Sequence, residues 1–179
     1  FYFLTTLSRT VEYYFYFFVN LLIQVTLLRY LSFKISCFMS ERSSSNSCTT
    51  KKDLRFINFK HLNGPNRWTY YPTTEATVDI GELEDFPSDK IPGFYERLSA
   101  WLPSLIEHRC SYEEHGGFLR RVKEGTWPCH ILEHVTLELQ NLAGMKGGFG
   151  RARETSTRGV YHVAVSAWHA EIAKTAMHF

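Results

Sequence analysis

The order in which strand-like and helix-like patterns follow one another restricts the fold of this chain more than any single motif does. Apolar and polar residues alternate with the period of a half-buried strand in residues 54–59, 76–80 and 160–165. Apolar residues recur with helical spacing in residues 94–105, in residues 126–144 and from about Trp168 onward. Strands and helices in separate runs predict an α+β domain, in which a small sheet packs against helices, rather than a doubly wound parallel sheet.

Residues 126–144 carry the clearest helical pattern. Thr126 is suited to cap the amino end, Pro128 is tolerated in the first turn, and Gly144 is a typical stop. In the preceding helix, Pro103 is expected to cause a kink or a restart. The stripe expected to face the core of the domain consists of Ile131, Val135, Leu139 and Leu142.

The composition fits one globular domain. The chain has 179 residues, of which 44% are apolar and 21% are charged, which suffices for one hydrophobic core. A net charge of +2 is too mild to indicate nucleic-acid binding, which requires a dense basic face. The cysteines lack the paired close spacing of a zinc ribbon or a disulfide framework, so a reducing cytoplasm is the default. They are Cys37, Cys48, Cys110 and Cys129.

The first 38 residues are crowded with Phe, Tyr and Leu. Residues 13–31 approach the length of a membrane-spanning helix. However, Asn20 and Gln24 lie inside this stretch, and no signal-peptide cleavage site follows it. We interpret residues 1–38 as an aromatic-rich leader that is not native and has no fold of its own. A membrane anchor is the alternative interpretation.

A change of composition at Met39 predicts where the ordered part of the chain lies. Met39 opens a Ser-rich polar stretch, so residues 39–52 are expected to be disordered. The globular domain is then predicted to occupy residues 53–179.

The sequence His130-Ile131-Leu132-Glu133-His134 is a candidate zinc motif. It places two imidazoles one helical turn apart, with a carboxylate beside them that can take a proton from bound water. This is the inverted zinc-peptidase pattern. A hydrolytic zinc site needs three protein ligands, and we predict His108 as the third, with Glu107 as the alternative, because a helical hairpin can bring them against His130.

Two other interpretations of this region remain open. The polar side chains can simply form the solvated face of an amphipathic helix, without metal: His130, His134, Glu138 and Asn141. Cys110 and Cys129 can serve as soft metal ligands near the same histidines, although a lone cysteine is more often a small buried hydrophobic residue.

Two glycine-containing segments carry arginines that can bind an anionic polymer. The loop from Gly147 to Arg153 exposes backbone amides and adds Arg151 and Arg153, which can clamp carboxylates or phosphates. A second loop, at Gly116-Gly117, opens a short helix with two further arginines, Arg120 and Arg121. Neither segment has the Lys-Ser/Thr of a phosphate-binding loop, so no cofactor-binding residue is predicted. The alternative is a structural turn with solvated arginines.

Several short motifs follow one another in unbroken order through residues 54–179. They are Gly64-Pro65-Asn66-Arg67-Trp68, Ile91-Pro92-Gly93-Phe94, residues 102–108, Gly116-Gly117-Phe118, residues 130–139, Ala143-Gly144-Met145, Gly148-Phe149-Gly150-Arg151 and Arg153-Glu154-Thr155. Taken together, these motifs resemble one family, the amino-terminal domain of cyanophycin synthetases.

The resemblance implies a cytoplasmic, homo-oligomeric enzyme that uses ATP and Mg to extend a poly-aspartate backbone and to attach arginine to its side-chain carboxylates. In the family, an ATP-grasp module and a Mur-ligase-like module hold the ligation centres. We expect neither in this chain, and therefore no polymer synthesis by it alone.

The resemblance also implies a role for the domain itself. In the family the domain binds cyanophycin, and in some members it resembles a metallopeptidase that trims the polymer into primers. This implies zinc at His130 and His134, with Glu133 as the catalytic base. The alternative is a non-catalytic scaffold for the missing ligase modules.

Overall fold

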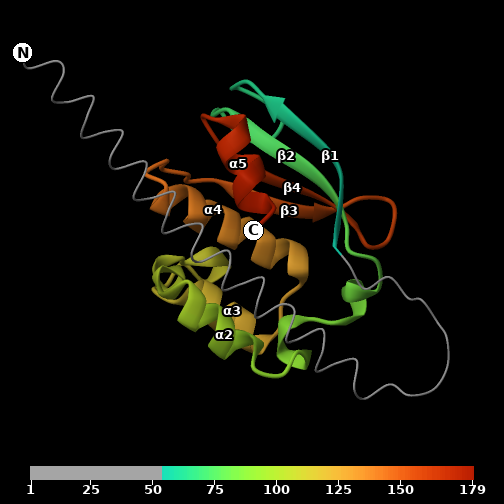
Figure 1. Cartoon of the computed structure of the whole chain (residues 1–179), viewed down its shortest axis with the longest axis vertical. Coiled ribbons are helices and arrows are strands. Elements are labelled where there is room, and N and C mark those ends of the chain that lie inside the picture. The colour runs from blue at the N-terminus through green and yellow to red at the C-terminus, as the bar shows by residue number, and fades with distance from the viewer. Residues whose placement is uncertain (1–53) are drawn as a thin grey trace, which may run out of the picture. The chain divides into compact units, whose positions relative to one another are not determined.

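The computed structural model describes residues 54–179, so the predictions for residues 1–38 and 39–52 lie outside the described residues. The described part is a four-stranded antiparallel sheet with helices, which confirms the predicted α+β class (Figure 1). The strands are β1 (Arg55–Leu62), β2 (Thr73–Asp79), β3 (Gly150–Glu154) and β4 (Val160–Ser166). The α-helices are α2 (Phe94–Trp101), α3 (Gly117–Glu124), α4 (Pro128–Leu142) and α5 (Ala170–Met177). Short 3-10 helices are η1 (Gly81–Asp85), η2 (Ser88–Lys90), η3 (Pro103–Glu107) and η4 (Cys110–Tyr112).

The sheet has the strand order β1-β2-β4-β3, and one of its faces is apolar. Ala76 of β2 lies opposite Val163 of β4 in the antiparallel register, so their side chains share that face. They pack against Leu137 of α4 and Ala173 of α5. The alternation that predicted half-buried strands therefore produces one face that packs on helices.

Helix α4 lies between the sheet and helices α2 and α3 (Figure 1), and it contributes side chains to two hydrophobic cores. One flank contributes Leu137 to the core beneath the sheet, and the other contributes Ile131 and Val135 to a core shared with α2 and α3. Phe118 of α3, which is fully buried, belongs to this second core. Because α4 is covered on both flanks, polar groups on it are drawn into the interior.

The structure corrects two local predictions. Residues 150–154 form strand β3 rather than the end of a glycine-rich loop, because they pair with β4 from Gly150↔Val165 to Glu154↔Tyr161. Thr126 does not cap α4: the capping position is Trp127, without a side-chain cap, and the Thr126 hydroxyl contacts the His130 ring instead. Pro103 restarts the chain as η3 after α2 ends, as predicted.

Within residues 54–179, no helix combines the length and the apolar character needed to span a membrane. The aromatic stretch that suggested a span, residues 13–31, lies outside this part of the chain.

Candidate functional site

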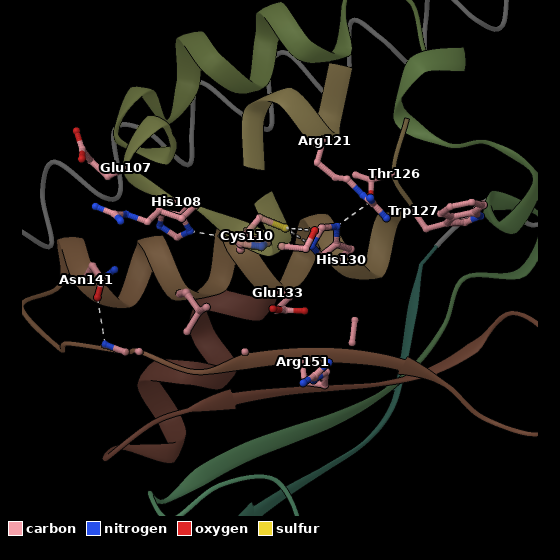
Figure 2. Close-up of a pocket in the computed structure, with 18 of the residues that line it drawn as sticks. Glu107, His108, Cys110, Arg121, Thr126, Trp127, His130, Glu133, Asn141 and Arg151 are labelled. Atoms are coloured by element: carbon pink, nitrogen blue, oxygen red, sulfur yellow. Dashed lines mark hydrogen bonds between the residues drawn. The ribbon is translucent and has the colours of Figure 1, made fainter. Parts of the chain in front are cut away.

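A cavity of about 820 Å³ runs along α4, between the η3–η4 segment on one side and β3 on the other (Figure 2). The polar residues that line it include Glu107, His108, Cys110, Arg121, Thr126, His130, Glu133, His134, Asn141 and Arg151. The two histidines of the predicted zinc motif and the carboxylate between them therefore open into one space.

The η3–η4 segment is held against α3 by a close backbone approach. Gly117 begins α3, and a Cβ atom at this position would lie 2.0 Å from the carbonyl oxygen of Arg109. The amide of Phe118 donates to the carbonyl of His108 at 2.9 Å. Only glycine permits this approach, and it places His108 and Cys110 over α4.

His130 is oriented by contacts at both ring nitrogens. Its Nδ1 lies 2.7 Å from the Thr126 hydroxyl, and its Nε2 lies 3.3 Å from Cys110 Sγ. When Nδ1–H donates to the hydroxyl oxygen, the lone pair of Nε2 points toward Cys110. The contact with Thr126 thus fixes the orientation of the His130 ring.

His134 is oriented by a chain of hydrogen bonds that ends at a carboxylate. Glu138 can only accept when ionised, so His108 donates to it through Nε2 at 2.8 Å. With neutral rings, His108 Nδ1 then accepts from His134 Nδ1, 2.9 Å away. This leaves the Nε2 lone pair of His134 available. Phe118 stacks on the His134 ring with centroids 4.0 Å apart, which fixes the plane of the ring.

Cys110, His130 and His134 form a cluster of side chains of the types that can bind a metal ion. One ligand atom from each lies within 4.8 Å of the others. Cys110 has a positive φ of 54°, in the left-handed region that a residue with a side chain seldom adopts. Such a conformation persists where surrounding contacts hold it, and here it directs the thiol toward the two imidazoles.

Burial keeps both imidazoles of the motif in their neutral form. It lowers the pKa of His130 to about 4, and the charge of Arg121 adds to the effect. It lowers the pKa of His134 to about 3, with contributions from His130 and His108. Neutral imidazole is the state that binds a metal ion.

Glu133 extends from α4 toward β3 (Figure 2). Burial raises its pKa to about 7, while a hydrogen bond from the backbone of Ala152 and the charge of Arg151 oppose the shift. A Cβ atom on Gly150 would lie 2.6 Å from Glu133 Cγ, so the strand reaches the carboxyl group only because that side chain is missing. A carboxyl group with a pKa near neutrality can both accept and return a proton.

The remaining predicted residues separate into two groups. Arg121 and Arg151 line the cavity, whereas Arg120 forms ion pairs with Glu114 and Glu124 and does not line it. Arg153 lies over the ring of Trp68, away from the residues that line the cavity. Glu107 lines the cavity, is exposed and pairs with His115.

The solvated-face interpretation of α4 is wrong for two of its four residues. His134 and Glu138 are only 7% and 5% exposed, whereas Asn141 faces solvent. The sequence analysis considered Cys110 only as an alternative ligand and did not select Thr126 or Glu138 for the site. The spacing of Thr126 and Glu138, each four residues from a motif histidine, was the one available signal.

Comparison with known proteins gives a consistent result. The model of the cyanophycin synthase-like N-terminal domain family matches residues 75–179. The chain is similar to proteins named cyanophycin synthetase: 46% identical over 125 residues to that of Geminocystis herdmanii, 48% over 125 residues to that of Trichormus variabilis, and 55% over 112 residues to that of Synechocystis sp.. These alignments cover 69%, 69% and 62% of this chain, but only 14%, 14% and 13% of the relatives.

Proposed function

The chain belongs to the family of cyanophycin synthase-like N-terminal domains, and from this premise we propose that it binds cyanophycin and hydrolyses its backbone with a zinc-activated water. In this proposal the parent protein is a cytoplasmic, homo-oligomeric ligase that uses ATP and Mg in ATP-grasp and Mur-ligase-like modules. The observation that supports a hydrolytic role is the convergence of Cys110, His130, His134 and Glu133 on one cavity.

The donor set fits zinc. Thiolate and neutral imidazole are the ligands that zinc prefers, and three protein ligands leave a fourth position for water. The Thr126 hydroxyl and the chain from Glu138 through His108 give the ligating rings the supporting partners that metal-bound histidines have. We propose Cys110 as the third ligand in place of His108, because both ring nitrogens of His108 are already engaged.

The chemistry assigned to the chain's own residues is proton transfer and charge recognition. Zinc, when bound, supplies an acidified water and polarises the amide carbonyl. Glu133, on the same helix as the two histidines, accepts the proton of the attacking water and returns it to the leaving amine. A polymer of aspartate and arginine carries both signs of charge in every repeat, and a cavity lined by Arg151 and Glu107 offers both complements.

The test is zinc content and cleavage of soluble cyanophycin by the whole chain, comparing the parent with Glu133→Gln. We expect zinc in both proteins and cleavage by the parent alone, because the substitution removes the base but no ligand. The matched control is Glu171→Gln, an exposed residue of α5 that pairs with Lys174, which should cleave as the parent does. Equal cleavage by the parent and Glu133→Gln would refute the assignment of the base.

A non-catalytic scaffold domain for the ligase modules is the second candidate. It is favoured by one observation: Glu138, His108 and His134 satisfy one another without a metal ion. This alternative predicts neither zinc nor cleavage in the parent protein. Retention on insoluble cyanophycin would then separate a polymer-binding scaffold from one that serves the modules alone.

A further inference from the structure

Arg121 has a hydrogen-bond donor without a partner. Its side chain lines the cavity from α3, and its guanidinium lies 5.9 Å from the ring centroid of Tyr112. Its Nε is buried and has no hydrogen-bond partner among the described residues. Within the same residues the side chain forms no ion pair.

The neighbouring Arg120 shows that carboxylates are available close to this part of α3. Arg120 donates to Glu124 through Nε and to Glu114 through Nη1, both at 2.8 Å. Arg121 follows on the same helix, and its side chain points into the cavity (Figure 2). Arg120 thus forms two ion pairs on the surface of α3, whereas Arg121 forms none with the described residues.

The cavity has other arginines, Arg109 and Arg151, but these are exposed to solvent. A buried N–H without an acceptor is unfavourable in the free protein. A ligand that supplies an acceptor to Arg121 removes this penalty.

The chemistry of the donor defines the ligand. The Nε–H of arginine and one of its terminal N–H groups form an edge that matches the two oxygens of a carboxylate. Arg121 lies toward the end of the cavity that holds Thr126 and His130 (Figure 2). A carboxylate bound there is therefore close to the proposed zinc ligands.

We propose that Arg121 is a specificity-determining residue, which binds a free carboxylate of the substrate at the His130 end of the cavity and selects peptides with free carboxylates over their amidated counterparts. This inference rests on the proposed function. Arginine joined through its amino group to an aspartyl side chain keeps its own α-carboxylate free, so every repeat of the polymer carries the required group.

The test uses two short aspartyl-arginine peptides that differ only in the arginine α-carboxylates, which are free in one and amidated in the other. Their Kd values for the whole chain are measured by calorimetry. We expect the parent to prefer the free carboxylates by about 10- to 100-fold, as for a charge-assisted pair. Arg121→Gln should bring the ratio close to one without changing the Kd of the amidated peptide.

The control is Arg97→Gln, which removes the same charge from α2, where Arg97 donates to the carbonyl of Pro92 and does not line the cavity. It should keep the preference. Arg121→Lys, which keeps the charge but loses the two-donor edge, should lose most of it. An unchanged ratio in Arg121→Gln, or no preference in the parent, would overturn the proposal.

A readout on the parent alone covers the case in which Arg121→Gln does not fold. The Nε–H resonance of Arg121 should shift on addition of Nα-acetyl-arginine and not on addition of its amide; no difference overturns the proposal. Cleavage is measured separately. A carboxylate preference that depends on Arg121, without cleavage, would refute the proposed hydrolysis and support the carboxylate subsite. Cleavage with an unchanged ratio in Arg121→Gln would support the hydrolysis and refute the subsite.

Discussion

The orientation of the His134 imidazole depends on the Glu138 carboxylate, although the two side chains are joined only through His108. Glu138 holds His108 at 2.8 Å, and His108 in turn holds His134. We predict that Glu138→Gln, which can donate where the carboxylate could only accept, weakens zinc binding by about 10- to 100-fold, as loss of an outer partner usually does. Chelator competition measures the Kd for zinc. If Glu138→Gln and Glu171→Gln bind zinc equally, the hydrogen-bond chain has no role in metal binding.

A missing side chain on β3 makes room for Glu133. A Cβ atom at Gly150 would lie 2.7 Å from Glu133 Oε1 and 2.9 Å from Leu137 Cδ1. We predict that Gly150→Ala displaces the carboxyl group and lowers kcat by about 10-fold or more, since small misplacements of catalytic groups are costly. Gly148→Ala is the comparison, because nothing lies within 4 Å of its added Cβ. Steady-state kinetics on soluble cyanophycin should show the loss for Gly150→Ala alone.

At the level of the elements, strand β2 carries a buried carboxylate that anchors the β1–β2 connection. Glu75 is 2% exposed and accepts hydrogen bonds from Arg67 and from Trp68 Nε1. Burial alone would raise the pKa of Glu75, but these two hydrogen bonds and the charges of Arg67 and His162 lower it below its ordinary value. The pKa is therefore lower in the folded than in the unfolded chain.

The lowered pKa has a consequence for stability. The contribution of Glu75 is fully present above the unfolded pKa of about 4.3 and is lost as the pH falls through the lower folded value. Glu75→Gln should cost about 1–3 kcal/mol at pH 7, and the difference from the parent should shrink toward pH 3. Urea unfolding at both pH values measures this. A difference that does not change with pH would exclude the carboxylate as its source.

The sequence predicted elements well where the signal was periodic, and poorly where the signal came from pairing. Helix α4 and strand β4 follow from spacing alone. Strand β3 begins in a glycine-rich run, and its strand character comes from pairing with β4, which a local pattern does not contain. The same limit applies to Cys110, because a residue on a one-turn helix with a left-handed backbone meets His130 only through the packing of α3.

The predicted motif itself was read correctly as a helical arrangement, since His130, Glu133 and His134 all lie on α4 and line one cavity. Glu138 was considered as part of the solvated face of the helix, four residues beyond His134. This position suits a residue that acts through His108. Glu138 and His108 lie 30 positions apart in the sequence, so helical geometry alone does not reveal their contact.

At the scale of the whole molecule, α4 contributes to both cores. We therefore predict that substitutions in either core affect the unfolding of the whole domain. Leu137→Ala acts on the core beneath the sheet and Val135→Ala on the core shared with α2 and α3. Removing buried methyl groups costs about 1–5 kcal/mol at such positions. Because one helix joins the two cores, each variant should unfold in a single transition. Separate transitions, seen by circular dichroism and by Trp fluorescence, would show that the cores are independent.

The position of α4 between the two cores also determines how readily the site opens by local unfolding. Local openings of a protein are drawn from segments with few buried contacts, and amide hydrogens deep in a shared element exchange only when the entire fold opens. The amides of His134 and Glu138 lie on a helix flanked by packed side chains on both sides. Their exchange with deuterium is governed by global unfolding, so the two imidazoles keep their positions for as long as the domain stays folded.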